Sequence, residues 1–169
     1  EQMPTDDLSM EPGDVVAISD SMFGVRKSNG PYDKSAMGIV STRPGVTLGK
    51  AQVVNQVKVA LAGRVPVKVS LENGSIGRGD WLAASSTPGI AMKATTAGQA
   101  IGIAYEPYDG TQQSNKVMVF MIVGWHGVSE LTVGEQNGQI VNLDPEQLRT
   151  GLASLGLIVN PNGTLTVDT

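Results

Sequence analysis

Short apolar stretches alternate with turns rich in glycine and polar residues along most of the chain. Stretches dominated by Val, Ile and Ala with period-two alternation are typical of strands. We expect strands near residues 14–19, 23–28, 36–42, 57–61, 65–71, 80–84, 90–94, 100–106 and 117–123. Such short strands at roughly ten-residue spacing predict an all-β fold, an antiparallel β-barrel or sandwich of short strands.

Four Asn-Gly pairs punctuate this pattern, at residues 29–30, 73–74, 137–138 and 162–163. Asn and Gly both tolerate positive φ, which the two central positions of a tight hairpin turn require. The pairs therefore predict antiparallel strands on either side of each turn.

The character of the chain changes after residue 124, so we expect a β domain over 1–124 and an appendage over 125–169. Hairpins are predicted about Asn137-Gly138 and Asn162-Gly163, with a short helix over 145–155 between them. Pro145 suits the first helical position, and three leucines share one helical face, at 148, 152 and 155. This part of the sequence predicts a hairpin-helix-hairpin appendage.

A Gly-Asp pair stands before an apolar strand twice, in GDVVAIS at 13–19 and GDWLAAS at 79–85. An Asp at this position can accept hydrogen bonds from nearby backbone amides and fix the turn that precedes the strand. We therefore interpret Gly13, Asp14, Gly79 and Asp80 as structural turn residues. The tripeptide Arg78-Gly79-Asp80, which resembles an integrin ligand, belongs to the same turn in this interpretation.

Other pieces of the sequence also resemble one another. MGIV at 37–40 parallels IGIA at 101–104, and STRPGVTLGKA at 41–51 parallels SSTPGIAMKA at 85–94. The order of the pieces differs between the two copies. An internal repeat is therefore one open interpretation, and shared turn chemistry is the other.

Composition narrows the classes of function. Among 169 residues there are 21 glycines, one histidine and no cysteine, and the net charge is −4 with a pI near 4.9. An acidic chain has no basic surface for phosphates, so we expect neither nucleic acid nor an anionic membrane as a partner. The longest apolar run, at 117–125, is too short to span a bilayer, which argues against membrane insertion.

Few residues offer catalytic or ligand chemistry. His126 is the single candidate base for a serine triad, and its place at the end of an apolar strand favours a structural role. Five carboxylates crowd the first fourteen residues, and a solvated acidic arm explains them better than a cation site. Phosphate-binding glycine motifs are missing from the sequence. We expect no cofactor and no metal.

Residues Gly13 to Met121 resemble a domain near the C-terminal end of phage tail or neck-appendage proteins and large bacterial surface proteins. The segments that carry the resemblance are EPGDVVAIS, YDKSAMGIVSTRPGVTLG, VALAGRVPVKVS, ENGSIGRGDWLAASSTPGIAMKAT, GQAIGIAYE and KVMVFM. As a set they resemble the intramolecular chaperone autoprocessing domains of the glutamic-peptidase type.

That resemblance implies a homotrimer that helps a parent fibre or tail polypeptide to fold, at an extracellular surface or on a virion. It also implies self-cleavage at the domain's own N-terminal boundary by acidic residues, for which Glu1 is the candidate surviving catalyst. Any such cut would lie upstream of Glu1, so the chain itself is expected to be non-catalytic: a released module, a piece cut just inside the boundary, or a relative that does not cleave itself.

Two other classes of function stay open on the sequence alone. One is a noncatalytic structural or decoration β-domain of a capsid, fibre or cell-surface assembly. The other is an extracellular ligand-binding module, in which Trp81, Trp125 and the tyrosines would be exposed together as a stacking platform.

Overall fold

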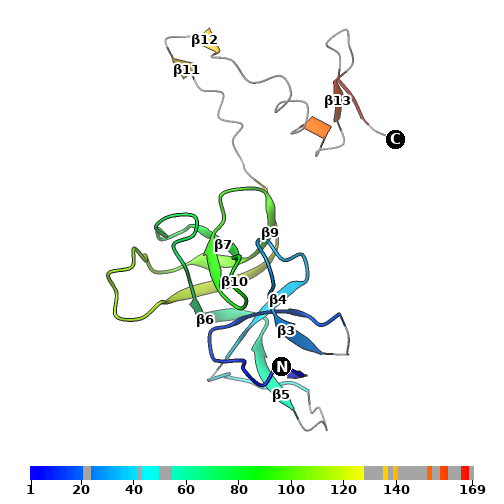
Figure 1. The fold of residues 1–169 in the computed structure, drawn as a ribbon, viewed down its shortest axis with the longest axis vertical. Coiled ribbons are helices and arrows are strands. Elements are labelled where there is room, and N and C mark those ends of the chain that lie inside the picture. The colour runs from blue at the N-terminus through cyan, green and yellow to red at the C-terminus, as the bar shows by residue number, and fades with distance from the viewer. Residues whose placement is uncertain are drawn as a thin grey trace. The chain divides into compact units, whose positions relative to one another are not determined.

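The fold is described from a computed structural model, in which the chain divides into two compact units, Glu1–Val128 and Ser129–Thr169 (Figure 1). The residues that the structure describes are 1–20, 24–41, 43–49, 55–127, 135–136, 139–140, 152–153, 157–159 and 165–167. The described part of the chain is all-β, as its sequence predicted.

The first unit contains two five-stranded antiparallel sheets. The first sheet has the order β1-β5-β4-β2-β3 and consists of β1 (Gln2–Pro4), β2 (Val15–Ile18), β3 (Val25–Lys27), β4 (Ala36–Val40) and β5 (Gln56–Ala60). The second has the order β6-β10-β9-β7-β8 and consists of β6 (Gly63–Lys68), β7 (Trp81–Ala84), β8 (Ala91–Lys93), β9 (Gly98–Ala104) and β10 (Lys116–His126).

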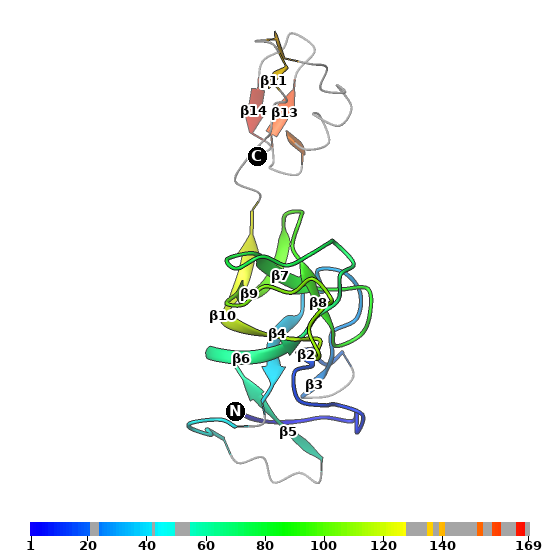
Figure 2. The same ribbon diagram turned by 90° about the vertical axis from the view of Figure 1, so that its left-hand side faces the viewer.

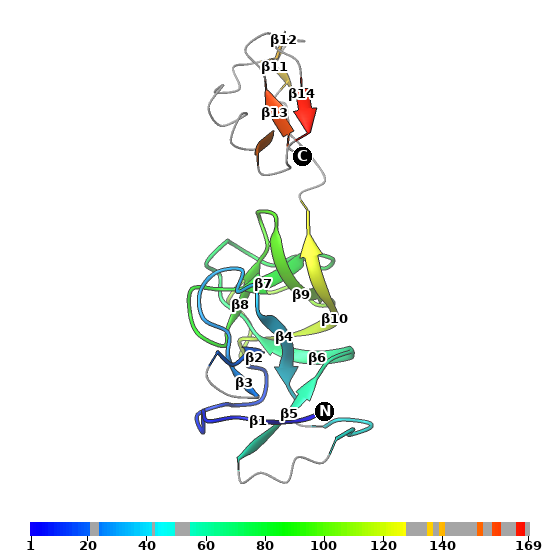
Figure 3. The same ribbon diagram turned by 90° about the vertical axis from the view of Figure 1, so that its right-hand side faces the viewer.

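All nine strands expected from the pattern are present in this unit, and β1 is the strand that the pattern did not predict. β1 has only three residues and ends in Pro4, so it carries no alternating apolar signal. It exists because its backbone pairs with β5, from Gln2 opposite Lys58 to Pro4 opposite Gln56 (Figure 3). A partner distant in sequence therefore decides this strand.

The two sheets have the same topology. Each strand of the first sheet has a counterpart in the second, since β1, β2, β3, β4 and β5 take the places of β6, β7, β8, β9 and β10. The irregularities match too, with a register shift between Val16 and Ala17 in β2 and between Leu82 and Ala83 in β7. The unit therefore consists of two copies of one fold, a first repeat (1–60) and a second repeat (63–126).

The two repeats show which of the similar sequence segments are structurally equivalent. Gly38 lies opposite Val16 as Gly102 lies opposite Leu82, so MGIV and IGIA are equivalent segments. The other pair of similar segments is not structurally equivalent, because 41–51 follows β4 whereas 85–94 connects β7 to β8 and includes β8. Both segments use Pro and Gly to turn the chain, which is sufficient to explain their likeness.

The core has two parts. A larger cluster combines residues of the second sheet, including Leu82, Ile101 and Val119, with Val15 and Ile39 of the first. A smaller cluster, with Val16, Val25, Val40 and Val59, lies within the first repeat. Alternation explains the division, since neighbouring residues of a strand point to opposite faces of the sheet. β4 contacts β9 and β10 of the other sheet (Figure 2).

Neither Asn-Gly pair of the first unit joins two paired strands, so the hairpins expected there were wrong. Asn29-Gly30 lies between β3 and β4, which both pair with β2 and not with each other. Asn73-Gly74 lies in the β6–β7 connection, and these strands are likewise not neighbours. Gly30 and Gly74 have positive φ, so the pairs turn the backbone within longer loops.

In the second unit, the described strands pair on either side of the other two Asn-Gly pairs, as expected. β11 (Glu135–Gln136) pairs antiparallel with β12 (Gln139–Ile140), and β13 (Leu157–Val159) pairs with β14 (Leu165–Val167). The helix expected over 145–155 lies outside the described residues, apart from 152 and 153, which are too few to define a helix.

Candidate functional site

Asp14 closes a tight turn immediately before β2. Its amide donates to the carbonyl of Glu11 at 3.0 Å, and its Oδ2 accepts a hydrogen bond from the Glu11 amide at 2.8 Å. Between them Gly13 has a φ of +95°, a conformation in which a Cβ would be strained. The Gly-Asp pair thus fixes the backbone that leads into the strand.

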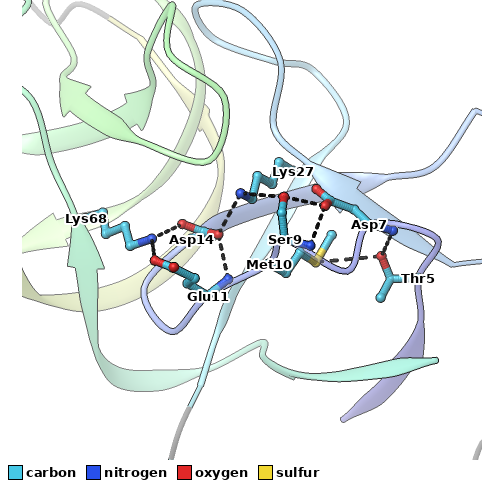
Figure 4. A network of polar contacts seen from close by, with 8 residues as sticks. All are labelled: Thr5, Asp7, Ser9, Met10, Glu11, Asp14, Lys27 and Lys68. Carbon is cyan, nitrogen blue, oxygen red and sulfur yellow. Dashed lines mark hydrogen bonds and ion pairs between the residues drawn. The ribbon is translucent and has the colours of Figure 1, made fainter.

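The Asp14 carboxylate lies at the centre of a charged cluster (Figure 4). Lys68 Nζ is 2.7 Å from its Oδ1, and Lys27 Nζ is 3.4 Å from its Oδ2. The Asp14 side chain is only 2% exposed, and a second acid, Glu11, approaches Lys68 Nζ at 2.7 Å. Because Lys27 lies in β3 and Lys68 in β6, the cluster joins the two repeats.

The charges of this cluster are mutually stabilised. The hydrogen bond from Lys68, and then the attraction of the same ammonium group, hold the pKa of Glu11 below its usual value. Burial alone would lower the pKa of Lys68, but the hydrogen bonds to Asp14 and Glu11 outweigh burial and raise it. Both shifts keep these groups charged at neutral pH, which suits an ion-pair clamp and not a proton donor.

Asp7 is held by a local contact with Ser9. Asp7 Oδ1 accepts hydrogen bonds from the Ser9 amide at 2.9 Å and from its hydroxyl at 2.5 Å, while Lys27 Nζ donates to the same hydroxyl at 3.1 Å (Figure 4). Of the five N-terminal acids, Glu1, Asp6 and Glu11 are exposed to solvent, whereas Asp14 is buried and paired, so the expected solvated acidic arm describes only part of this segment. Within the described residues, no group of three or more His, Cys, Asp or Glu side chains is arranged to hold a metal ion.

Asp80 repeats the Asp14 turn in the second sheet. Its Oδ2 accepts from the Gly77 amide at 2.7 Å, its own amide donates to the Gly77 carbonyl at 3.2 Å, and Gly79 has a φ of +91°. Lys93 Nζ lies 2.8 Å from Asp80 Oδ2, the counterpart of Lys27. The Asp80 side chain is 26% exposed and pairs with one lysine where Asp14 pairs with two.

Glu1 lies apart from this cluster, at the start of the first sheet. Its amino group donates to the Val59 carbonyl at 2.7 Å, and its carbonyl accepts from the Val59 amide at 2.8 Å. The residue borders a surface cavity of about 430 Å³ whose lining includes Ser41, Arg43 and Arg64. Among the described residues that line this cavity, Glu1 is the one carboxylate.

The aromatic residues do not form one platform in the described part of the chain. Trp81 stacks on His126, with ring centroids 5.0 Å apart and planes inclined by 24°. The Tyr32 hydroxyl accepts hydrogen bonds from the Thr95 and Thr96 amides, while Tyr108 packs against the core. Trp81, Tyr32 and Tyr108 are thus used in separate places, while Trp125 is 70% exposed and Tyr105 is 53% exposed.

The lysines of the two turns were not among the residues singled out from the sequence. A signal for them was present, since Lys27 and Lys93 each follow the aspartate of their repeat by thirteen residues. Lys68 has no such signal, because its place beside Asp14 follows from the packing of one repeat on the other.

Comparison of the chain with known protein families and with curated proteins gives no match. Among the residues that the structure describes, no helix has the length and apolar character needed to cross a bilayer.

Proposed function

We propose that the chain is a noncatalytic trimerisation and folding module, of the intramolecular chaperone type, in a surface fibre or phage tail-like protein. In this proposal the two sheets form a β-sandwich, and 125–169 forms a hairpin-helix-hairpin appendage. The module acts at an extracellular surface or on a virion, and its partners are its own copies and the parent polypeptide.

The exposed apolar side chains of β10 are the observation that carries this proposal. Phe120 is 49% exposed and Ile122 is 43% exposed, on the same long strand. Adjoining apolar side chains on a protein surface indicate an interaction site more often than a solvated face. An assembly role accounts for this surface.

The chemistry of the described residues also favours a noncatalytic role. The most buried carboxylate, Asp14, is committed to two lysines, and His126 stacks on Trp81. Self-cleavage therefore stays a separate part of the proposal, in which Glu1 would be the surviving acid of a site that includes residues upstream of it.

A compact end module has a physical reason to act as a folding chaperone for a fibre. Aligning three chains along a fibre is entropically costly, because each chain must find its register. Association of the modules first converts the search into an intramolecular one at high effective concentration.

Light scattering coupled to size exclusion tests the assembly proposal. We expect the full chain to elute with about three times its monomer mass of 17.6 kDa. A monomer at every concentration would contradict it. If that monomer binds a preformed fibre or capsid, the decoration role is favoured instead.

Expression of the parent with its upstream segment tests the cleavage proposal independently. We expect a product that begins near Glu1, and loss of that product when an upstream acidic residue is changed to its amide. Absence of the product would remove self-cleavage and leave the assembly proposal standing.

A further inference from the structure

The two Asn-Gly pairs of the first unit share sequence and backbone conformation but differ in their contacts. Gly30 has a φ of +91° and Gly74 a φ of +87°. A Cβ at either glycine would meet nothing within 4 Å, so both pairs also have open space around them. Any difference in their chemistry must therefore come from hydrogen bonding.

Asn73-Gly74 is held by two hydrogen bonds. The Asn73 side chain donates from Nδ2 to the Lys93 carbonyl at 2.9 Å, and the Gly74 amide donates to the Leu71 carbonyl at 2.9 Å. Asn73 is also partly buried. The side-chain amide and the backbone amide that follows it are thus both fixed by the fold.

Asn29-Gly30 lacks these contacts. Asn29 is exposed, and its backbone amide donates to Asp33 Oδ2 at 2.9 Å. Within the described part of the chain, neither the Asn29 side-chain amide nor the Gly30 backbone amide takes part in a hydrogen bond. The two groups are free to approach each other.

We propose that Asn29 is a site of spontaneous deamidation, a modification that does not depend on the assembly proposal. The Gly30 nitrogen attacks Cγ of Asn29, the bond from Cγ to Nδ2 breaks, and ammonia leaves with the proton that the Gly30 amide gives up. Glycine has no Cβ to shield its nitrogen from this attack. Water then opens the resulting succinimide ring at either carbonyl, which gives aspartate or isoaspartate.

The contacts of Asn73 oppose the same reaction in two ways. Attack requires the Gly74 amide to lose its proton, and a hydrogen bond donated to the Leu71 carbonyl stabilises the protonated form. Attack also requires the side chain to turn toward that nitrogen, which the hydrogen bond to Lys93 resists. Local opening must break both bonds before the ring can close, so the fold protects Asn73 and leaves Asn29 reactive.

The modification acts on the connection between β3 and β4. Asp33 holds this connection by accepting the Asn29 amide and pairing with Arg26 at 2.7 Å. A carboxylate at residue 29 adds negative charge beside Asp33, and isoaspartate lengthens the backbone between residues 29 and 33 by one methylene group.

Peptide mapping by mass spectrometry, after incubation of the full chain in mildly alkaline buffer, tests the proposal. Trypsin places the two pairs in separate peptides, 28–34 and 69–78, and separates both from the pairs at 137–138 and 162–163, which lie outside the described residues. The peptide 28–34 should gain about 1 Da, at least about tenfold faster than 69–78.

Unfolding in urea is the matched control, because both pairs keep their sequence and lose their contacts. The two peptides should then convert at rates that agree within about a factor of three. In the folded chain, Asn29→Gln should abolish the conversion of 28–34 and leave 69–78 unchanged.

Several outcomes contradict the proposal. Equal conversion of the two peptides in the folded chain would show that the hydrogen bonds do not decide reactivity, and conversion of neither would show that Asn29 is not a site. A difference that persists in urea would assign the selectivity to neighbouring sequence and not to the fold.

Discussion

Asp14 and Asp80 make the same contacts in two different sheets. Each carboxylate accepts the amide of the residue three positions earlier, Glu11 at 2.8 Å and Gly77 at 2.7 Å. Each backbone carbonyl accepts the amide of the counterpart strand, Val40 or Ala104, at 2.8 Å. The difference lies in burial and in the number of lysines, so the two residues should contribute differently to stability.

We expect Asp14→Asn to lower the free energy of unfolding by about 3 kcal/mol, since Lys27 loses its carboxylate and Lys68 keeps only the exposed Glu11 as a partner. Asp80→Asn should cost about 1 kcal/mol, because this pair is partly exposed to solvent. Urea unfolding of both variants measures the difference. Equal losses would show that the second lysine and the burial of Asp14 contribute nothing.

Asp33 should contribute to the pH dependence of stability. Burial alone raises the pKa of its carboxyl, but hydrogen bonds from Arg26 at 2.7 Å and from the Asn29 and Ser35 amides at 2.9 Å outweigh burial and lower it below 3.8. Because the pKa is lower in the folded state, the stabilisation is present above the unfolded-state pKa and is lost as pH falls through the folded-state pKa.

Chemical denaturation at a series of pH values checks this expectation. The unfolding free energy of the wild type should fall between about pH 4 and about pH 2, and Asp33→Asn should show a shallower decline over the same range. Parallel curves for the two proteins would mean that the Asp33 carboxyl titrates alike in both states.

Gly102 lies where β9 passes close to β10. A Cβ at this position would meet the backbone oxygen of Phe120, which cannot move without disturbing the pairing of the two strands. We expect Gly102→Ala to lower the free energy of unfolding by about 2 kcal/mol or more. Thermal unfolding should show it, and Gly124→Ala in β10, with open space around its Cβ, should be close to neutral.

Tyr32 ties the loop after β3 to the loop before β9. Its hydroxyl accepts hydrogen bonds from the Thr95 amide at 2.9 Å and from the Thr96 amide at 3.0 Å. Tyr32→Phe should cost about 1 kcal/mol, because the ring stays and only these acceptors are lost. Hydrogen exchange should quicken at the Thr95 and Thr96 amides, and unchanged protection there would contradict the role.

Much of the fold could be predicted from local pattern. The alternation of apolar and polar residues identified nine strands, and the paired Gly-Asp turns marked two of their starts. β1 escaped because three residues ending in Pro4 have no pattern of their own. The Asn-Gly hairpins of the first unit were mispredicted because a turn sequence fixes local φ and not which strands become neighbours.

The sequence by itself determined the all-β class, the strands with strong alternation and the turn chemistry of Gly13 and Gly79, since these depend on near neighbours in the chain. Only the tertiary structure decided that the two sheets are copies of one topology, that Lys68 neutralises Asp14, and that Ala60 packs against the core while Phe120, at the equivalent position of the second sheet, is left exposed. These features depend on which distant segments pack together, and a period of two along a strand carries no information about what will lie on either face.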